Sequence, residues 1–280
     1  MKKVLVTGAN GQLGRCLHDI SKEYNNLYFI FLNKLELDIN DENAISEYFR
    51  KNAISYCINT AAYTNVDAAE ENEAEAFAIN AEAVKNLAKT CRKNNVTLIH
   101  ISTDYVFDGK NRTPYLETDL VNPINVYGKS KLMGEQYIIE NCPRHFIIRT
   151  SWLYSQYGKN FFKTVKSLLE GGKPFSITTE QKGTPTNAKD LASALIKIIE
   201  QDINQYGVYH YANAGEATWF DFALAIAALL DPTKSHLVEK TAHYPTKAKR
   251  PENSRLNCDK FATVFSENMI DWKESLKINN

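Results

Sequence analysis

Short apolar runs alternate with longer segments of helical periodicity along the first half of the chain. Apolar residues recur at helical spacing in residues 74–94 and 129–140. Five short apolar runs predict β-strands, at residues 4–7, 28–32, 54–59, 97–102 and 146–150. Strands that alternate with helices indicate repeated βαβ units, and hence a parallel sheet covered on both faces. We therefore predict an α/β fold built on a Rossmann-type, doubly wound parallel sheet.

The second half of the chain is less regular. It predicts helices at residues 161–169, 188–200 and 218–230, and a strand at 207–211. Because the helix at 188–200 and the strand at 207–211 resemble another αβ unit, we expect the chain to return to the sheet there. We predict a larger domain of residues 1–150 plus about 186–214, and a smaller, C-terminal substrate lobe of residues 151–185 and 215–280.

Composition narrows the range of partners. The 280 residues carry 33 basic and 33 acidic side chains, which gives no electrostatic reason to expect nucleic acid or a membrane surface as partner. No apolar run reaches the length of a membrane span, and the N-terminus lacks the pattern of a signal peptide, so we expect a cytoplasmic protein. The five cysteines are widely spaced and predict free thiols. The six histidines show no ligand spacing, so we predict no metal site.

A glycine-rich turn follows the first predicted strand. Gly8, Gly11 and Gly14 have a Gly-x-x-Gly-x-x-Gly spacing and stand where a helix is predicted to begin. Glycine allows the backbone to turn sharply and approach a pyrophosphate, and the helix N-terminus offers free N–H groups to that anion. The turn therefore predicts a dinucleotide site in the larger domain; the alternative is an ordinary strand-to-helix turn.

Two residues after the second predicted strand bear on the choice of dinucleotide. An acidic residue usually holds the ribose 2′-hydroxyl about 20 positions after the glycine turn, and here Asn33 and Lys34 occupy that place. Lys34 offers a charge to a 2′-phosphate, so we predict NADPH as the preferred cofactor, with NADH tolerated. The alternative is that Lys34 is simply solvated. Asp38 could bind the adenine amino group or cap the helix that begins near Asp41.

Candidate chemistry follows the fourth predicted strand. Tyr127 and Lys131 form a Tyr-x-x-x-Lys pair on one helix face, where we expect the Lys charge to lower the pKa of the phenol. Thr103, at the end of the strand, could hydrogen-bond a substrate carbonyl. These are the parts of a carbonyl reductase, in which Tyr127 supplies the proton. Because the chain has 15 tyrosines, the pair alone could also arise by chance.

Longer motifs give these residues a family context. The chain resembles the extended short-chain dehydrogenase/reductases and, among them, the family of dTDP-4-dehydrorhamnose reductases. The motifs that carry the resemblance span nearly the whole chain and lie at residues 8–14, 59–70, 102–109, 125–135, 149–154 and 250–256. The resemblance implies reduction of the C4 ketone of dTDP-4-dehydro-L-rhamnose to dTDP-L-rhamnose by NADPH. It leaves open another nucleotide-sugar reductase or epimerase, or a noncatalytic regulatory relative.

The resemblance also implies roles for individual residues. It implies a catalytic triad of Thr103, Tyr127 and Lys131. The implied cofactor contacts are Gly8, Asn10, Gly11, Gln12, Leu13, Asn33, Lys34, Asp38, Ile39, Ala61, Ala62 and Tyr63, together with Tyr127 and Lys131. The implied contacts to the nucleotide sugar are Thr64, Val66, Thr103, Asp104, Trp152 and Arg250. Trp152 could instead be core packing, Arg250 could close a surface loop, and Thr64 could cap a strand end.

The chain departs from the family pattern at a metal site. Some members pair through glutamates around Mg²⁺, and the matching positions here are Cys16 and Lys189. A thiol and an ammonium are poor ligands for Mg²⁺, which prefers oxygen. We therefore predict no Mg²⁺-bridged dimer, and a monomer or weak homodimer.

Overall fold

A computed structural model describes residues 1–242 and 244–278. Its centre is a parallel sheet with strand order β10-β5-β4-β3-β1-β2. The strands are β1 (Lys2–Thr7), β2 (Leu27–Leu32), β3 (Tyr56–Asn59), β4 (Thr97–Thr103), β5 (His145–Thr150) and β10 (Gly207–His210). All six predicted strands lie in this sheet, with ends shifted by one or two residues. The predicted α/β class with a doubly wound parallel sheet is confirmed.

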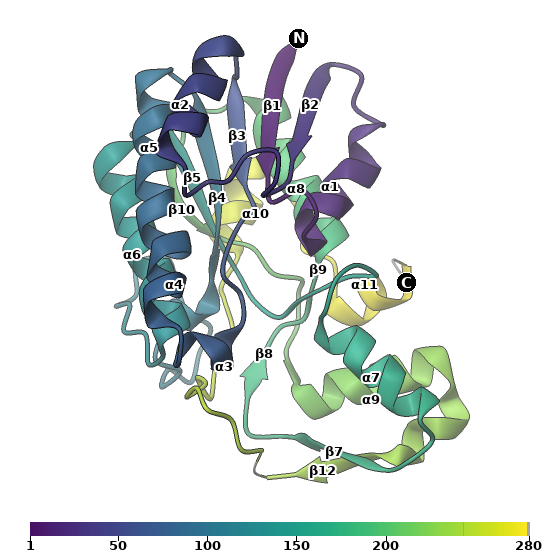
Figure 1. The fold of residues 1–280 in the computed structure, drawn as a ribbon. Helices are drawn as coiled ribbons and strands as arrows, with labels where there is room; N and C mark the ends of the chain where they lie inside the picture. Colours follow the sequence, from purple (N-terminus) through teal and green to yellow (C-terminus); the bar gives the residue numbers. More distant parts are fainter. Residues whose placement is uncertain (243, 279–280) are drawn as a thin grey trace.

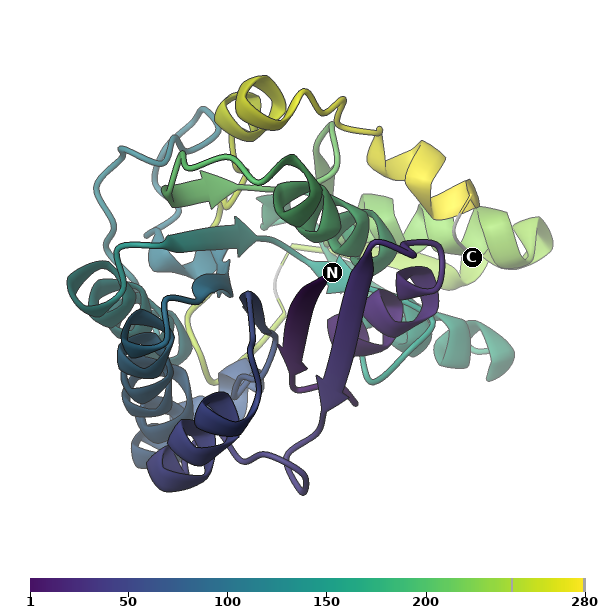
Figure 2. The ribbon, with the colours of Figure 1, turned by 90° about the horizontal axis from the view of Figure 1, so that it is seen from above.

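Helices cover both faces of the sheet (Figure 1; Figure 2). One face packs against α1 (Gln12–Ser21), α8 (Ala188–Gln201) and α10 (Asp259–Phe265). The other packs against α2 (Glu42–Lys51), α5 (Ala83–Lys93) and α6 (Val126–Asn141). Successive strand residues point to opposite faces, so Val4 and Val6 belong to the first layer and Leu5 to the second. Because both layers exclude water, the inner strands are continuous apolar runs.

A smaller group of elements lies beyond the carboxyl ends of the strands (Figure 1). Helices α7 (Phe161–Glu170), α9 (Trp219–Leu230) and α11 (Trp272–Ile278) share one apolar cluster with strand β12 (Val238–Thr241), which pairs with β7 (Phe175–Thr178). Between these elements the chain returns to the sheet through α8 and β10. Phe261 and Phe265 of α10 also pack with the sheet layer. The division of the chain into two domains stays a prediction; this packing would assign α10 to the larger one.

The predicted helix at residues 74–94 is interrupted. It consists of α4 (Glu73–Phe77), a π-helical turn at Ala78–Glu82 and α5. The turn directs Asn80 toward the loop after β3, where its amide accepts from Tyr63 N–H at 2.9 Å and donates to Tyr63 O at 3.0 Å. This wider turn has no periodic signal in the sequence, and such turns are frequent at functional sites.

The remaining elements are short. They are α3 (Val66–Ala69), the 3₁₀ turns at Asp104–Val106 and Pro232–Leu237, and the strands β6 (Leu153–Tyr154), β8 (Lys182–Gly183), β9 (Thr186–Asn187) and β11 (Ala217–Thr218). All five cysteines are free thiols, as predicted. In the part of the chain that the structure describes, no helix is both long and apolar enough to cross a membrane.

Candidate active site

The turn between β1 and α1 is built to receive an anion. Gly8 has φ +68°, and a Cβ there would come within 2.6 Å of Ala61 N in the loop after β3. A Cβ at Gly14 would come within 2.7 Å of Ala9 Cα, so this glycine lets α1 pack on the turn. Gly11 caps α1 without any side-chain hydrogen bond to the first-turn amides. These N–H groups are therefore free for a ligand, and the site fits a pyrophosphate.

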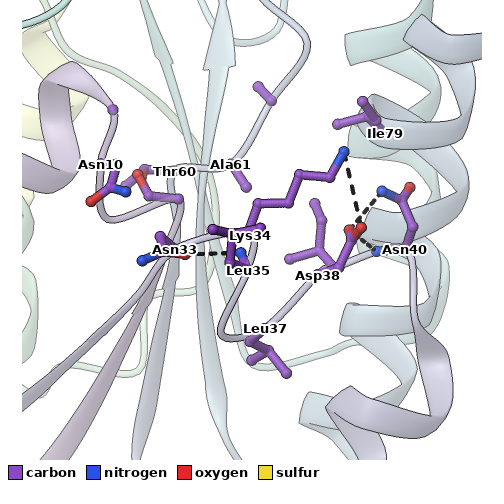
Figure 3. A pocket seen from close by; sticks show the side chains of 14 residues that line it. Asn10, Asn33, Lys34, Leu35, Leu37, Asp38, Asn40, Thr60, Ala61 and Ile79 are labelled. Atoms are coloured by element: carbon purple, nitrogen blue, oxygen red, sulfur yellow. Dashed lines mark hydrogen bonds and ion pairs between the residues drawn. The ribbon is translucent and has the colours of Figure 1, made fainter.

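A first cavity of about 350 Å³ opens at the carboxyl ends of β1, β2 and β3 (Figure 3). Asn33, just after β2, is engaged in its own turn, because Oδ1 accepts from Leu35 N–H at 2.8 Å. Lys34 extends toward Asp38, and Lys34 Nζ lies 4.0 Å from Asp38 Oδ2 (Figure 3). The predicted cofactor residues that line this cavity are Gly8, Asn10, Gly11, Asn33, Lys34, Asp38, Ile39, Ala61 and Ala62.

A second cavity, of about 510 Å³, lies between the sheet and the smaller group of elements. Gly11, Thr60 and Ala62 line both cavities, so the two meet at the glycine turn. The predicted site residues that line the second cavity are Gly11, Gln12, Leu13, Ala62, Thr64, Thr103, Asp104, Tyr127, Lys131 and Trp152. The two cavities together provide room for an elongated ligand whose centre rests on the turn.

Three predicted site residues line neither cavity: Tyr63, Val66 and Arg250. Tyr63 packs in a small apolar cluster beside Tyr127. Arg250 donates two hydrogen bonds to the carboxylate of Asp67, at 3.0 and 2.8 Å. Its guanidinium therefore ties the segment near residue 250 to α3. The predicted roles of these three residues stay predictions.

Tyr127 and Thr103 meet in the second cavity. Helix α6 begins three residues earlier than predicted, because Asn125 caps it by accepting from Gly128 N–H at 2.7 Å, and Tyr127 lies in its first turn. Burial raises the pKa of Tyr127 to about 12; a hydrogen bond with Thr103 lowers this pKa, and the charge of Asp104 raises it. The phenol therefore keeps its proton at neutral pH and can donate it.

Lys131 does not act on Tyr127 as predicted. Lys131 Nζ donates to Ile101 O at 2.6 Å and lies 3.1 Å from His100 Nε2. Burial lowers the pKa of Lys131 to about 8, while the charge of Glu135 raises it. The prediction that Lys131 lowers the pKa of Tyr127 is wrong for this structure, because burial dominates the phenol and the amine points toward β4.

Asp104 is a buried carboxyl beside the phenol. Only 3 % of Asp104 is exposed. Thr103 Oγ1 donates to its Oδ1 at 3.0 Å, whereas its Oδ2 has no hydrogen-bond partner. Burial raises its pKa to about 7, although the nearby hydroxyls of Ser254 and Thr103 lower this pKa. A buried, unpartnered oxygen at a cavity wall is suited to accept a hydrogen bond from a ligand hydroxyl.

Trp152 both packs and lines the second cavity. Its ring stacks on Trp219 with centroids 3.6 Å apart and planes 8° apart. A Cβ at Gly183 would lie 2.4 Å from Trp152 Cε2, so the backbone of β8 also contacts the indole. Trp152 has φ +48°, an uncommon conformation for a bulky residue. The indole therefore serves core packing as well as the cavity, with less of its flat surface free than we predicted.

A loop at residues 155–160 completes the cavity and was missed in the sequence. Gln12 Oε1 accepts from Asn160 Nδ2 at 2.8 Å and from Ser155 Oγ at 3.1 Å, which joins α1 to this loop. Lys159, in the same loop, is exposed and lines the cavity. Asn160 is the N-cap of α7, so a capping signal before Phe161 could have indicated where the loop ends.

A metal site is not apparent in the described residues. They contain no group of three or more His, Cys, Asp or Glu side chains placed to hold an ion, and His243 lies outside them. Cys16 and Lys189 line a third cavity of about 290 Å³ together with Asp19. The predicted lack of a Mg²⁺-bridged dimer stays a prediction.

A parallel sheet with an anion-binding turn at the end of β1, beside a buried Thr and Lys and a half-buried Tyr, defines an NAD(P)-dependent oxidoreductase of the extended short-chain dehydrogenase/reductase class. Comparison with known proteins gives the family. The model of the RmlD substrate binding domain matches residues 1–279. The chain belongs to the family of dTDP-4-dehydrorhamnose reductases.

Individual relatives agree over their full length. A dTDP-4-dehydrorhamnose reductase of Aggregatibacter actinomycetemcomitans is 39% identical and aligns over 99% of this chain and 98% of the relative. The crystal structure of a dTDP-4-dehydrorhamnose reductase from Clostridium acetobutylicum has a TM-score of 0.92 at 37% identity, covering 99% and 98% of the two chains. One from Bacillus anthracis, solved in complex with NADP, has a TM-score of 0.92 at 34% identity, covering 100% and 99%.

Proposed function

We propose that this chain reduces the C4 ketone of dTDP-4-dehydro-L-rhamnose to dTDP-L-rhamnose with NADPH, and that Tyr127 donates the proton. The observation that carries the proposal is the second cavity, where Tyr127, Thr103 and Lys131 line the wall beside the glycine turn. Family membership and the names of the full-length relatives support the substrate.

NADPH fits the two joined cavities. The free amides at the start of α1 suit its pyrophosphate, and the first cavity suits its adenosine half. Lys34 is exposed at the mouth of this cavity, so its ammonium can attract a 2′-phosphate (Figure 3). The complex of the Bacillus anthracis relative with NADP supports this choice. When bound, the reduced nicotinamide supplies the hydride.

The residues of the chain supply binding, polarisation and the proton. Tyr127 donates a hydrogen bond to the ketone oxygen, which becomes more negative as the carbonyl is reduced. Thr103 donates a second one when its hydroxyl hydrogen turns from Asp104 Oδ1 to this oxygen. Tyr127, protonated at neutral pH, transfers its proton to this oxygen. Lys131, on the wall of the same cavity, is assigned to the cofactor ribose.

The sugar nucleotide occupies the rest of the second cavity. The free oxygen of Asp104 accepts a hydrogen bond from a sugar hydroxyl, and Trp152 limits the space around the ring. Arg250 is already paired with Asp67. The exposed Lys159 is therefore the better placed cation for the diphosphate.

The decisive experiment follows loss of NADPH absorbance with dTDP-4-dehydrorhamnose generated by the preceding epimerase. We expect one NADPH to be oxidised for each ketone reduced, and little activity with GDP-linked ketosugars. Interconversion of sugars without net oxidation would instead identify an epimerase. Unchanged NADPH with every ketosugar, by a folded protein that binds the cofactor, would identify a noncatalytic relative.

A further inference from the structure

A row of polar side chains crosses the buried sheet next to Lys131. Thr7 pairs in register with Asn59, and Asn59 pairs with His100. The three residues lie on the face covered by α2, α5 and α6, because each stands two positions after a residue of that apolar layer: Leu5, Cys57 and Leu98. None is more than 1 % exposed. Polar groups buried in such a position must form hydrogen bonds with one another.

Hydrogen bonds run along the whole row. Thr7 Oγ1 donates to Asn59 Oδ1 at 2.7 Å, and Asn59 Nδ2 lies 3.0 Å from His100 Nδ1. At the far end, His100 Nε2 lies 3.1 Å from Lys131 Nζ. The row therefore connects β1, β3 and β4 to the lysine proposed for the active site.

The backbone fixes the direction of these bonds. Ala61 N–H donates to Asn59 Oδ1 at 3.2 Å, and a backbone N–H can only donate. This contact identifies the oxygen of the Asn59 amide, so the nitrogen faces His100 Nδ1. His100 Nδ1 must then accept, and in a neutral imidazole the hydrogen is carried by Nε2. The Nε2–H group points at Lys131, which can accept it only as a neutral amine with a free lone pair.

We propose that His100 is a positioning residue for Lys131: Asn59 holds His100 in the tautomer with hydrogen on Nε2, and this N–H donates to the neutral amine of Lys131. A protonated Lys131 has no lone pair and cannot accept this bond. It must leave His100 or force the imidazole into the other tautomer, against the contact of Asn59 with Ala61. Protonation of Lys131 is thereby coupled to the tautomer of His100, a residue that lines neither cavity. This inference deepens the proposed function. Its consequence for catalysis rests on that function.

Other titratable groups also lie near Lys131. Glu135, on the next turn of α6, raises the pKa of Lys131, but it is paired with Arg149 of β5 through contacts of 2.7 to 3.2 Å. Tyr127 and Asp104 line the same cavity as Lys131. Burial lowers the pKa of His100 well below its ordinary value, and the charge of Lys131 lowers it further, so the imidazole is neutral.

The first test needs no ligand and no activity. The ring nitrogens of ¹⁵N-histidine-labelled wild-type protein are observed by NMR at pH 9, above the pKa of Lys131, and His100 is assigned by the signal lost in His100→Gln. We expect protonated Nε2 and unprotonated Nδ1. The opposite tautomer, or an even mixture of the two, would overturn the proposal.

Asn59→Asp then tests whether Asn59 determines the tautomer of His100. The carboxylate is nearly the same shape but accepts from His100 Nδ1–H, so the hydrogen is expected to move to Nδ1 and Lys131 to stay protonated to higher pH. Asn80→Asp is the matched control, because Asn80 is equally buried but contacts Tyr63 and Ser130 instead of His100. Asn80→Asp adds a similar charge and is expected to leave the hydrogen of His100 on Nε2. The same tautomer in Asn59→Asp as in wild type would contradict the proposal.

Kinetics separate positioning from simple structural support. His100→Gln keeps an acceptor for Asn59 and a donor for Lys131, so we expect its kcat/KM to stay within about threefold of wild type, with a similar pH profile. His100→Leu lacks both and is expected to lose at least tenfold, with an altered profile. Equal loss in both variants would argue against positioning. A wild-type protein without reductase activity would refute the proposed function, yet the tautomer measurement would still decide this inference.

Discussion

Asp104→Asn is expected to stabilise the fold at neutral and alkaline pH while impairing the reaction. The carboxyl group is 3 % exposed, and one of its oxygens has no hydrogen-bond partner. Ionisation therefore leaves a negative charge in a poorly solvating position. The amide of asparagine is similar in shape and carries no charge, so the substitution removes this cost and keeps an oxygen that can accept from Thr103.

The magnitude follows from the pKa. Burial raises the pKa of Asp104 from 3.8 to about 7. At about 1.4 kcal/mol for each tenfold change in proton affinity, the ionised form costs about 4 kcal/mol of folding free energy. An acid with a raised pKa binds more protons when folded, so wild-type stability falls as the pH rises from 3.8 to about 7. The advantage of the variant should be absent near pH 4 and complete above pH 7.

Urea denaturation of both proteins at several pH values between 4 and 8.5 measures this difference. Asp108→Asn is a control for which we expect a stability change of opposite sign. Burial raises the pKa of Asp108, but hydrogen bonds from Lys110, Tyr115 and Asn122 outweigh this effect, so the pKa of Asp108 is lowered. That variant should be less stable than wild type at high pH. A pH-independent difference for Asp104→Asn would refute the reasoning, as would a variant that is less stable than wild type at pH 8.

Other predictions concern the cofactor, the acid and assembly. Tyr127→Phe should still bind NADPH in a fluorescence titration but lose about 10²- to 10⁴-fold in kcat; wild-type turnover would exclude Tyr127 as the acid. Lys34→Ala should lower kcat/KM with NADPH several-fold and leave the NADH value unchanged; equal losses with both cofactors would indicate a damaged turn instead. Light scattering should give the same mass with and without EDTA, because Cys16 and Lys189 offer no oxygen ligands; a dimer that dissociates on chelation would show the prediction to be wrong.

Much of the fold could be predicted because its signals are local. Strands buried on both faces are apolar runs wherever they pair, and the turn at Gly8 follows such a run directly. The alternation of helix and strand also predicted that the chain returns to the sheet through the helix at residues 188–200 and the strand at 207–211. The π-helical turn around Asn80 was missed because it is set by the contacts of one side chain with Tyr63, 17 positions away.

The site was predicted less completely, for a related reason. Tyr127 and Lys131 are four positions apart, so their common helix could be predicted from spacing alone. The contact between Lys131 and His100 depends on how α6 lies on β4, and the contact of His100 with Asn59 depends on strand register. Neither contact can be predicted from the spacing of residues along the chain. The prediction for the pKa of Tyr127 failed because sequence shows proximity along a helix but not the depth of burial, which here decides the pKa.

Energetically unfavourable features cluster around the second cavity. Asp104 is a buried carboxyl with an unpartnered oxygen, and Trp152 adopts a backbone conformation that costs about 1 to 3 kcal/mol for an ordinary residue. Lys131 is a fully buried amine. Nearer the amino ends of the strands the same layer is apolar, at Leu5, Cys57, Leu98 and Ile147. Strain and buried charge persist where they serve a function, so these three features support the proposed site independently of any sequence motif.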